Sequence, residues 1–346
     1  GSGCGNDVAS ERPMVRKFIV DSVKYWATEY NMDGFRFDLM GLMDIKTINE
    51  ITAALKKIDP TILVIGEGWN MGTLPANQKA NQLNIQKLNG VSHFNDQIRD
   101  GIKGSVFDSA DTGFATGKFG AKNDVMSGIV GNVDYSTTVN TKWTTSYPGQ
   151  SVNYVESHDN MTLVDKINAS VKDAKPSDVA QLSQLSASIA FLSQGLPFMQ
   201  AGQEFLRSKN GDPNSYKSSD EVNSMKWGTK KSNIATVDYY KGLIALRKAH
   251  PAFRMTTTAQ VKSNLKFLDS SEGTIAYSLN GAAVQDKAAT IVVMHNATTS
   301  DQIFTLPKTG SWSVLVEGER AGTVVIRKFT GASISVKGRS TLVITQ

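Results

Sequence analysis

The chain has 346 residues, of which 40% are hydrophobic and 20% charged, a balance typical of a soluble globular protein. Its formal net charge of +5 arises from basic residues dispersed among 32 acids, so no nucleic-acid partner is expected. The single cysteine, Cys4, excludes a disulfide scaffold and a cysteine-based metal site. No apolar run is long enough to cross a bilayer, so no membrane partner is expected either.

Helical and strand-like segments alternate over the first 256 residues. Residues 13–30 and 45–58 carry apolar side chains at helical spacing. Further helices are expected at 177–194 and 236–249, and short apolar strands at 34–40, 63–68, 91–96, 151–159 and 195–202. This alternation predicts an α/β fold with a parallel sheet. Because polar motif residues stand at the ends of several strands, the pattern favours a (β/α)8 barrel.

A complete barrel of this kind has eight strands in about 250 residues, whereas only five candidate strands precede residue 257. The chain also opens as GSGCGNDVASERPM, without an initiator methionine. We therefore expect a barrel that lacks its N-terminal strands, with an upstream portion missing.

The pattern changes near residue 257, where helical periodicity stops. Short segments rich in Val, Ile, Thr and Phe follow, and turns such as Lys308–Gly310 separate them. The expected strands are 266–268, 274–279, 290–295, 303–306, 312–316, 323–327 and 333–345. Their spacing predicts a small antiparallel β-sandwich. We thus divide the chain into a partial catalytic barrel, 1–256, and an all-β domain, 257–346.

Two carboxylates stand at the ends of consecutive expected strands. Side chains alternate along a strand, so Arg36 and Asp38 point the same way. Taken alone, this pair is equally well explained by a buried salt bridge. Glu67 emerges between two glycines at the end of the next strand, where a lone Glu is usually a solvated charge or a helix cap. Neighbouring barrel strands would bring Asp38 and Glu67 close together.

Such a pair suits glycoside hydrolysis, in which one carboxylate attacks the anomeric carbon and the other protonates the leaving oxygen. A separation of about 5–5.5 Å marks retention of configuration. Arg36 would keep Asp38 ionised, whereas Glu67 needs a raised pKa, which a dry pocket supplies. Trp69, which follows Glu67, could stack on a sugar or simply pack in the interior.

A third polar element is YVESHDN, residues 154–160. Asp159 could hydrogen-bond sugar hydroxyls in the transition state, and His158 could donate to a neighbouring hydroxyl. The competing interpretation is a loop hydrogen bond between the two side chains. A Ser-His-Asp triad that uses Ser157 is disfavoured, because contiguous residues do not form the required relay easily.

Three segments resemble the conserved blocks of the α-amylase clan of glycoside hydrolases. They are DGFRFDLMG (33–41), VIGEGW (64–69) and VESHDN (155–160), in the clan's order. The LMG after Asp38, the opening segment, FNDQIRDGIKGSVFD (94–108) and NSYKSSDEVNSMKW (214–227) are most similar to type I pullulanases. This resemblance implies cleavage of α-1,6 linkages in pullulan, amylopectin and limit dextrins. It implies a catalytic set of Asp38 (nucleophile), Glu67 (acid/base) and Asp159 (transition-state stabiliser), with Arg36, Trp69, His158 and Asn160 binding substrate.

The clan's first block and the pullulanase-type Tyr-Asn-Trp-Gly-Tyr-Asp-Pro stretch are missing here, so we expect this chain alone to be poorly stable and inactive. The alternatives are an isoamylase, a glycogen debranching enzyme, an α-1,4 amylase, or a non-catalytic α-glucan-binding fragment. No cofactor or metal is expected. Calcium occurs in the clan, but no dense Asp/Asn ligand loop is present. The complete protein is expected to act as a monomer on an α-glucan, and its localisation is left open between cytoplasm and secretion.

Overall fold

The structure is a computed structural model that describes all 346 residues. A five-stranded parallel sheet runs through the first part of the chain, and its strand order is the chain order. Its strands are β1 (Gly34–Phe37), β2 (Leu63–Gly66), β3 (Val91–Phe94), β4 (Ser151–Asn153) and β5 (Leu196–Pro197). These are the five strands expected from the sequence. All of them are shorter than expected, β4 and β5 most of all, and Pro197 has no backbone N–H with which to extend β5.

Ten α-helices accompany the strands, and none of them has both the length and the apolarity needed to cross a membrane. They are α1 (Pro13–Glu29), α2 (Ile45–Ile58), α3 (Asp96–Lys103), α4 (Lys122–Ile129), α5 (Leu163–Ser170), α6 (Pro176–Leu192), α7 (Asp220–Asn223), α8 (Gly228–Ser232), α9 (Ile234–Ala249) and α10 (Thr258–Asn264). Side-chain caps define several starts: Asp44 accepts from the Thr47 amide at α2, and Asn95 from the Ile98 amide at α3. The helix α10 corrects the expectation that helices end before residue 257.

The last part of the chain forms an antiparallel sheet in the order β10-β9-β12-β8-β7-β6, with β11 also paired to β9. Its strands are β6 (Leu265–Leu268), β7 (Thr274–Asn280), β8 (Thr290–Asn296), β9 (Gln302–Glu317), β10 (Arg320–Ala321), β11 (Arg327–Val336) and β12 (Ser340–Thr345).

Three expectations for this sheet were wrong. The strand expected at 333–345 is in fact parts of two strands, because residues 337–339 separate β11 from β12. The turn expected at Lys308–Gly310 lies inside the continuous strand β9. The register with β11 shifts there, from Gly331 opposite Gly310 to Ser333 opposite Thr305. The extra residues of β9 therefore form a bulge and not a turn. The strand expected at 323–327 is also absent. Residues 323–326 connect β10 to β11 without strand conformation, although the Ile326 amide donates to the Val314 carbonyl of β9 at 2.8 Å.

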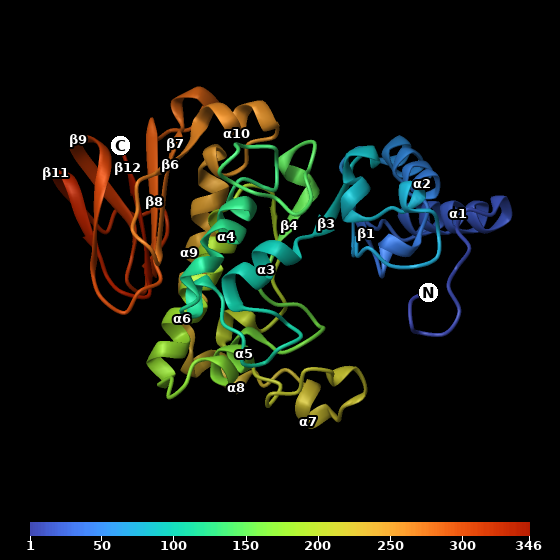
Figure 1. Cartoon of the computed structure of the whole chain (residues 1–346), viewed down its shortest axis with the longest axis horizontal. Helices are drawn as coiled ribbons and strands as arrows, with labels where there is room; N and C mark the ends of the chain where they lie inside the picture. Colours follow the sequence, from blue (N-terminus) through green and yellow to red (C-terminus); the bar gives the residue numbers. More distant parts are fainter.

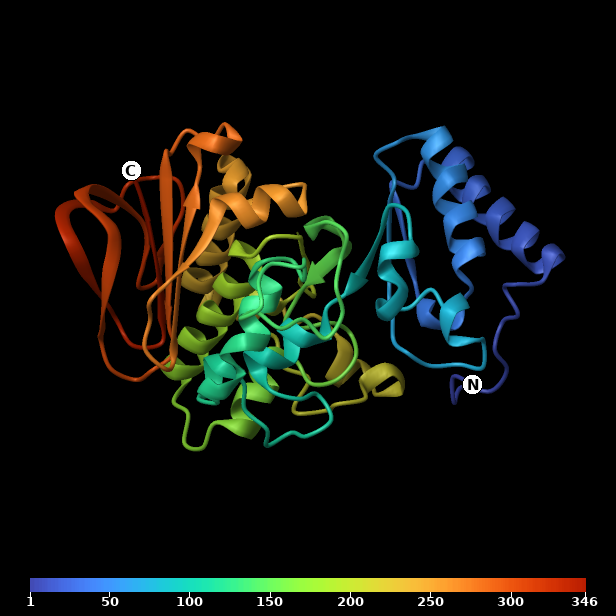
Figure 2. The ribbon, with the colours of Figure 1, turned by 45° about the horizontal axis from the view of Figure 1, so that its top comes forward.

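The buried side chains form one large core and smaller separate ones. A cluster of 40 buried residues joins α3–α6 and α9 to the near face of the antiparallel sheet, including Ile291, Val293 and Val343. The other face of that sheet covers its own core around Trp312. A separate cluster of 13 buried residues lies among α1, α2, β1 and β2. Figures 1 and 2 show this N-terminal region at one end of the molecule, joined to the central helices through β3, with the antiparallel sheet at the opposite end.

Candidate active site

The carboxyl ends of β1 and β2 bring Arg36, Asp38 and Glu67 together. The two strands are parallel, with Arg36 opposite Ile65 and Phe37 opposite Gly66. Arg36 Nη1 lies 2.5 Å from Asp38 Oδ1, and Nη2 lies 3.0 Å from Glu67 Oε1. A single guanidinium thus bridges both predicted catalytic carboxylates. The pair is not the buried salt bridge considered above, because the Asp38 side chain is 71% exposed.

The two carboxylates occupy different environments. Glu67 is only 7% exposed, and its Oε2 accepts a hydrogen bond of 2.8 Å from the Leu39 amide. Burial raises the pKa of Glu67, with a smaller contribution from the carboxylates of Asp38 and Asp159; the Leu39 hydrogen bond and Arg36 oppose the shift. These environments suit two different roles. The buried carboxyl with the raised pKa suits acid catalysis, and the exposed, arginine-paired carboxylate suits nucleophilic attack.

The glycines on either side of Glu67 are required by close packing beneath it. A Cβ on Gly68 would lie 2.2 Å from His93 Nδ1, and one on Gly66 would lie 2.5 Å from Met40 Cε. His93, on β3, is fully buried, and burial lowers its pKa to about 3, so its ring is neutral. Sequence reasoning missed this support, although His93 stands in the strand that it predicted.

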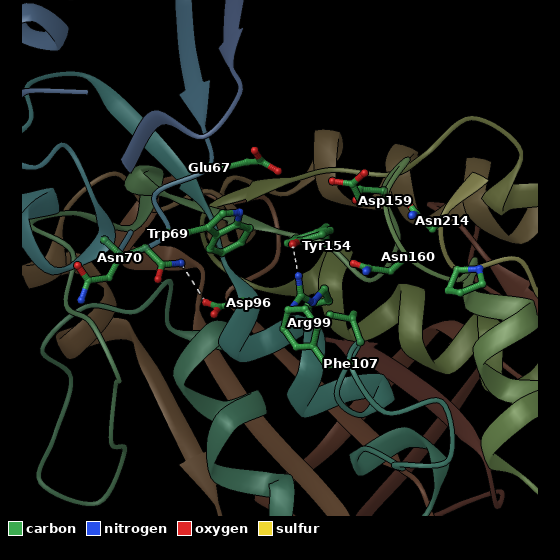
Figure 3. A pocket seen from close by; sticks show the side chains of 14 residues that line it. Glu67, Trp69, Asn70, Asp96, Arg99, Phe107, Tyr154, Asp159, Asn160 and Asn214 are labelled. Carbon is green, nitrogen blue, oxygen red and sulfur yellow. Dashed lines mark hydrogen bonds between the residues drawn. The ribbon is translucent and has the colours of Figure 1, made fainter. Parts of the chain in front are cut away.

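A cavity of about 610 Å³ opens beside Glu67, as Figure 3 shows. Trp69 lines this cavity and also packs against the buried cluster of Phe94, Val152 and Tyr154. The Arg99 guanidinium lies 5.9 Å from the Trp69 ring centre and 5.7 Å from that of Tyr154. Arg99 Nη1 also donates to the Tyr154 hydroxyl at 2.9 Å. Sequence reasoning did not single out Arg99 or Tyr154, although Arg99 lies within the quoted segment 94–108.

The loop after β4 places Asp159 and Asn160 on the same cavity as Glu67. His158 lines a smaller adjoining cavity of about 270 Å³ together with Arg36 and Glu67. The imidazole Nε2 of His158 is 3.6 Å from Asp159 Oδ1, and both side chains are 61% exposed. That separation is too long for a hydrogen bond, so the relay of the disfavoured triad is not formed. The seven residues predicted from the sequence therefore gather around two neighbouring cavities and the Arg36 bridge.

Comparison with known proteins identifies the family. A family model described as "Pullulanase, all-beta domain" matches residues 261–320. The chain is 40% identical over 99% of its length to the pullulanase of Bacillus subtilis (strain 168), covering 47% of that protein. It is 31% identical to the chloroplastic pullulanase 1 of Arabidopsis thaliana, over 77% of this chain and 36% of that protein. The chain belongs to the pullulanase family.

Solved structures of the family agree. The pullulanase of Bacillus acidopullulyticus superposes on all of this chain with a TM-score of 0.94 and 41% identity, and 42% of that chain is covered. The Paenibacillus barengoltzii pullulanase in complex with maltohexaose and α-cyclodextrin gives a TM-score of 0.94 and 42% identity, with 100% of this chain and 52% of that one covered. The chain spans about half of the length of these pullulanases.

No group of three or more His, Cys, Asp or Glu side chains is placed to hold a metal ion. The site of this pullulanase relative is built from carboxylates, the two arginines Arg36 and Arg99, and aromatic rings. The absence of a cofactor stays a prediction.

Proposed function

We propose that this chain carries the catalytic carboxylates of a retaining hydrolase that cleaves α-1,6-glucosidic linkages in pullulan, amylopectin and limit dextrins. The observation that carries the proposal is the Arg36 bridge, which holds an exposed Asp38 and a buried Glu67 together at adjacent strand ends. Family membership supports the substrate class, because the family's members named above are pullulanases.

In the proposed mechanism Asp38 attacks the anomeric carbon while Glu67 gives its proton to the departing glycosidic oxygen. The C–O bond to the leaving glucan breaks as the bond to Asp38 forms. Glu67, now ionised, then takes a proton from water, which displaces Asp38 and restores the starting state. Asp159 accepts hydrogen bonds from sugar hydroxyls as the ring distorts. Trp69, His158 and Asn160 contact the substrate, and Arg36 pairs with Asp38 and orients it.

We further propose that the five parallel strands are part of a (β/α)8 barrel completed by the rest of the protein, with the all-β domain beginning at residue 257. Two features support this. β1 has a partner only on its β2 side, and α1 exposes large apolar side chains such as Met14 and Phe18, each 74% exposed. The complete protein would act as a monomer on its polysaccharide, whereas the 346-residue chain alone would be inactive.

The test is hydrolysis of pullulan by the natural protein that contains this chain. We expect maltotriose units to be released with the α configuration retained, which NMR of the first product detects. Asp38→Asn should abolish turnover, whereas Asp238→Asn, an exposed carboxylate on α9, should not change it. Normal activity of Asp38→Asn would refute the nucleophile assignment.

Preference for amylose over pullulan would favour an α-1,4 amylase. Retention on amylopectin without hydrolysis would indicate a binding protein, and turnover by the isolated chain would refute its predicted inactivity.

A further inference from the structure

The loop that carries Asp159 is fastened at both ends. Glu156, before the loop, accepts a hydrogen bond of 2.8 Å from the amide of Leu163, the first residue of α5. With its amide nitrogen turned toward them, Gln200 donates to Glu156 Oε1 and to the Ser157 carbonyl, both at 2.8 Å. Between these points His158 and Asp159 are exposed, and Asn160 takes a left-handed φ of 65°. The end contacts alone leave the peptide that precedes Asp159 unconstrained.

That peptide is held by a buried lysine from another segment. Lys209 is 3% exposed, and its Nζ donates to the His158 carbonyl at 2.9 Å. The His158 carbonyl belongs to the peptide bond that joins His158 to Asp159, so its position sets the direction in which the Asp159 side chain leaves the backbone.

Lys209 is itself anchored to α5. Its backbone amide donates to Asp165 Oδ2 at 2.8 Å, and the neighbouring Ser208 hydroxyl donates to Asp165 Oδ1 at 2.5 Å. Asp165 lies in the first turn of the helix that follows the Asp159 loop. The lysine, its anchor and the loop thus form a closed structural unit, and the same segment continues to Asn214, which lines the cavity.

Burying this ammonium is unfavourable, because no carboxylate lies within ion-pair distance of Lys209 Nζ. Burial lowers the pKa of Lys209, although the carboxylates of Glu156 and Asp159 partly offset that shift. Burying an ammonium that donates to a single carbonyl costs folding free energy, and the loop at Asp159 is the segment that this contact holds. We infer that Lys209 is a positioning residue, which sets the orientation of Asp159 for the hydrolysis proposed above.

The test compares Lys209→Met with Lys217→Met in the natural protein that contains this chain. Lys217 is an exposed lysine in the same connection, and its ammonium lies over the exposed ring of Tyr216. We expect Lys209→Met to lower kcat on pullulan by about ten- to a hundredfold, as misplacement of a reacting group by about 1 Å does, with KM within about twofold. Amides of 157–162 should exchange deuterium faster, while exchange elsewhere is unchanged. Lys217→Met should match the wild type in all three measurements.

Lys209→Arg provides the second arm, since a guanidinium retains donors for the His158 carbonyl. Partial recovery of kcat, with slow exchange restored at 157–162, would support a positioning role. Wild-type kcat and exchange in Lys209→Met would overturn the inference. So would a lower melting temperature with faster exchange throughout, because that describes a purely structural lysine. Only the kinetic measurements in this test rest on the proposed function. If the wild type does not hydrolyse pullulan, the proposed function fails, and deuterium exchange still decides whether Lys209 fixes the loop.

Discussion

The two ends of the molecule bury their apolar side chains to very different extents. The antiparallel sheet is covered on both faces, by the central helices on one side and by its own core around the fully buried Trp312 on the other. At the opposite end, α1 and α2 cover a cluster of only 13 buried residues. The outer side of α1 leaves Phe18 74% exposed and Trp26 41% exposed. The contrast is visible in Figure 2, where the N-terminal region projects from the rest of the molecule.

This difference bears on function because the site spans both kinds of region. Asp38 and Glu67 follow strands of the lightly covered end, whereas Asp159 follows β4, next to the large central core. The proposed chemistry therefore depends on the region with the least support of its own. Stability and catalysis should respond separately to substitutions at the two ends.

The largest expected effect is on activity, from a substitution at the lightly covered end. In the natural protein, Glu67→Gln removes the proton donor and should lower kcat/KM on pullulan by about 10²- to 10⁴-fold. Only the protonated Glu67 can act as the acid, so wild-type activity should fall as pH rises through its pKa. Because burial raises that pKa, the fall should come at a higher pH than for an ordinary glutamate. Steady-state kinetics across pH measures both effects.

The control is Glu29→Gln, an exposed glutamate at the end of α1, which should retain wild-type kinetics. The melting temperature of Glu67→Gln should stay near that of the wild type. If the fall of activity at high pH persists in Glu67→Gln, another group supplies the proton.

The next effect is on stability and compares the two ends directly. In the isolated chain, Trp312→Ala should lower the free energy of unfolding by about 3–5 kcal/mol, because it empties a closed core. Phe18→Ala should change it by less than about 0.5 kcal/mol, since that side chain is largely exposed. Urea denaturation followed by circular dichroism measures both values.

The same two substitutions, made in the natural protein, test whether upstream sequence covers α1. There Phe18→Ala should become clearly destabilising if upstream sequence covers α1, whereas the cost of Trp312→Ala should not change. Equal costs for Phe18→Ala in both contexts would mean that α1 stays uncovered, against the proposed barrel.

Sequence reasoning succeeded where local signals and tertiary structure agree. The helix predicted at 45–58 has those bounds, because its apolar face, its Asp44 cap and Pro60 all mark the same segment. It failed at β9, where Lys308–Gly310 has turn composition but the pairing with β11 absorbs the extra residues as a bulge. In the site, strand position alone left Asp38 and Glu67 open between a salt-bridged residue and a solvated one, and only the three blocks taken together singled them out. Support from distant segments could not be predicted, because nothing in the sequence near Asp159 indicates that Lys209 contacts its loop.

The smallest expected effect concerns a buried charge in the well-covered region. Glu156 is fully buried, and burial raises its pKa to about 7 from the ordinary 4.5. The folded state then binds the proton more tightly than the unfolded state does. The stability gained from this protonation is present below pH 4.5 and is lost as pH rises to about 7. Lys103, whose pKa burial lowers to about 8 from 10.5, changes stability only at higher pH.

Glu156→Gln removes this titration. Its carbonyl oxygen can still accept from the Leu163 amide, although its NH2 cannot accept the hydrogen bond from Gln200. We expect the wild-type melting temperature of the isolated chain to fall by a few degrees more than that of Glu156→Gln between pH 4.5 and 7. Glu221→Gln, an exposed control on α7, should follow the wild type. Parallel melting curves for the wild type and Glu156→Gln across this range would mean that Glu156 stays ionised. Its carboxylate would then be stabilised by Lys103 and Arg207, and the central region would tolerate a buried ion network, as the N-terminal region does at Arg16 and Asp44.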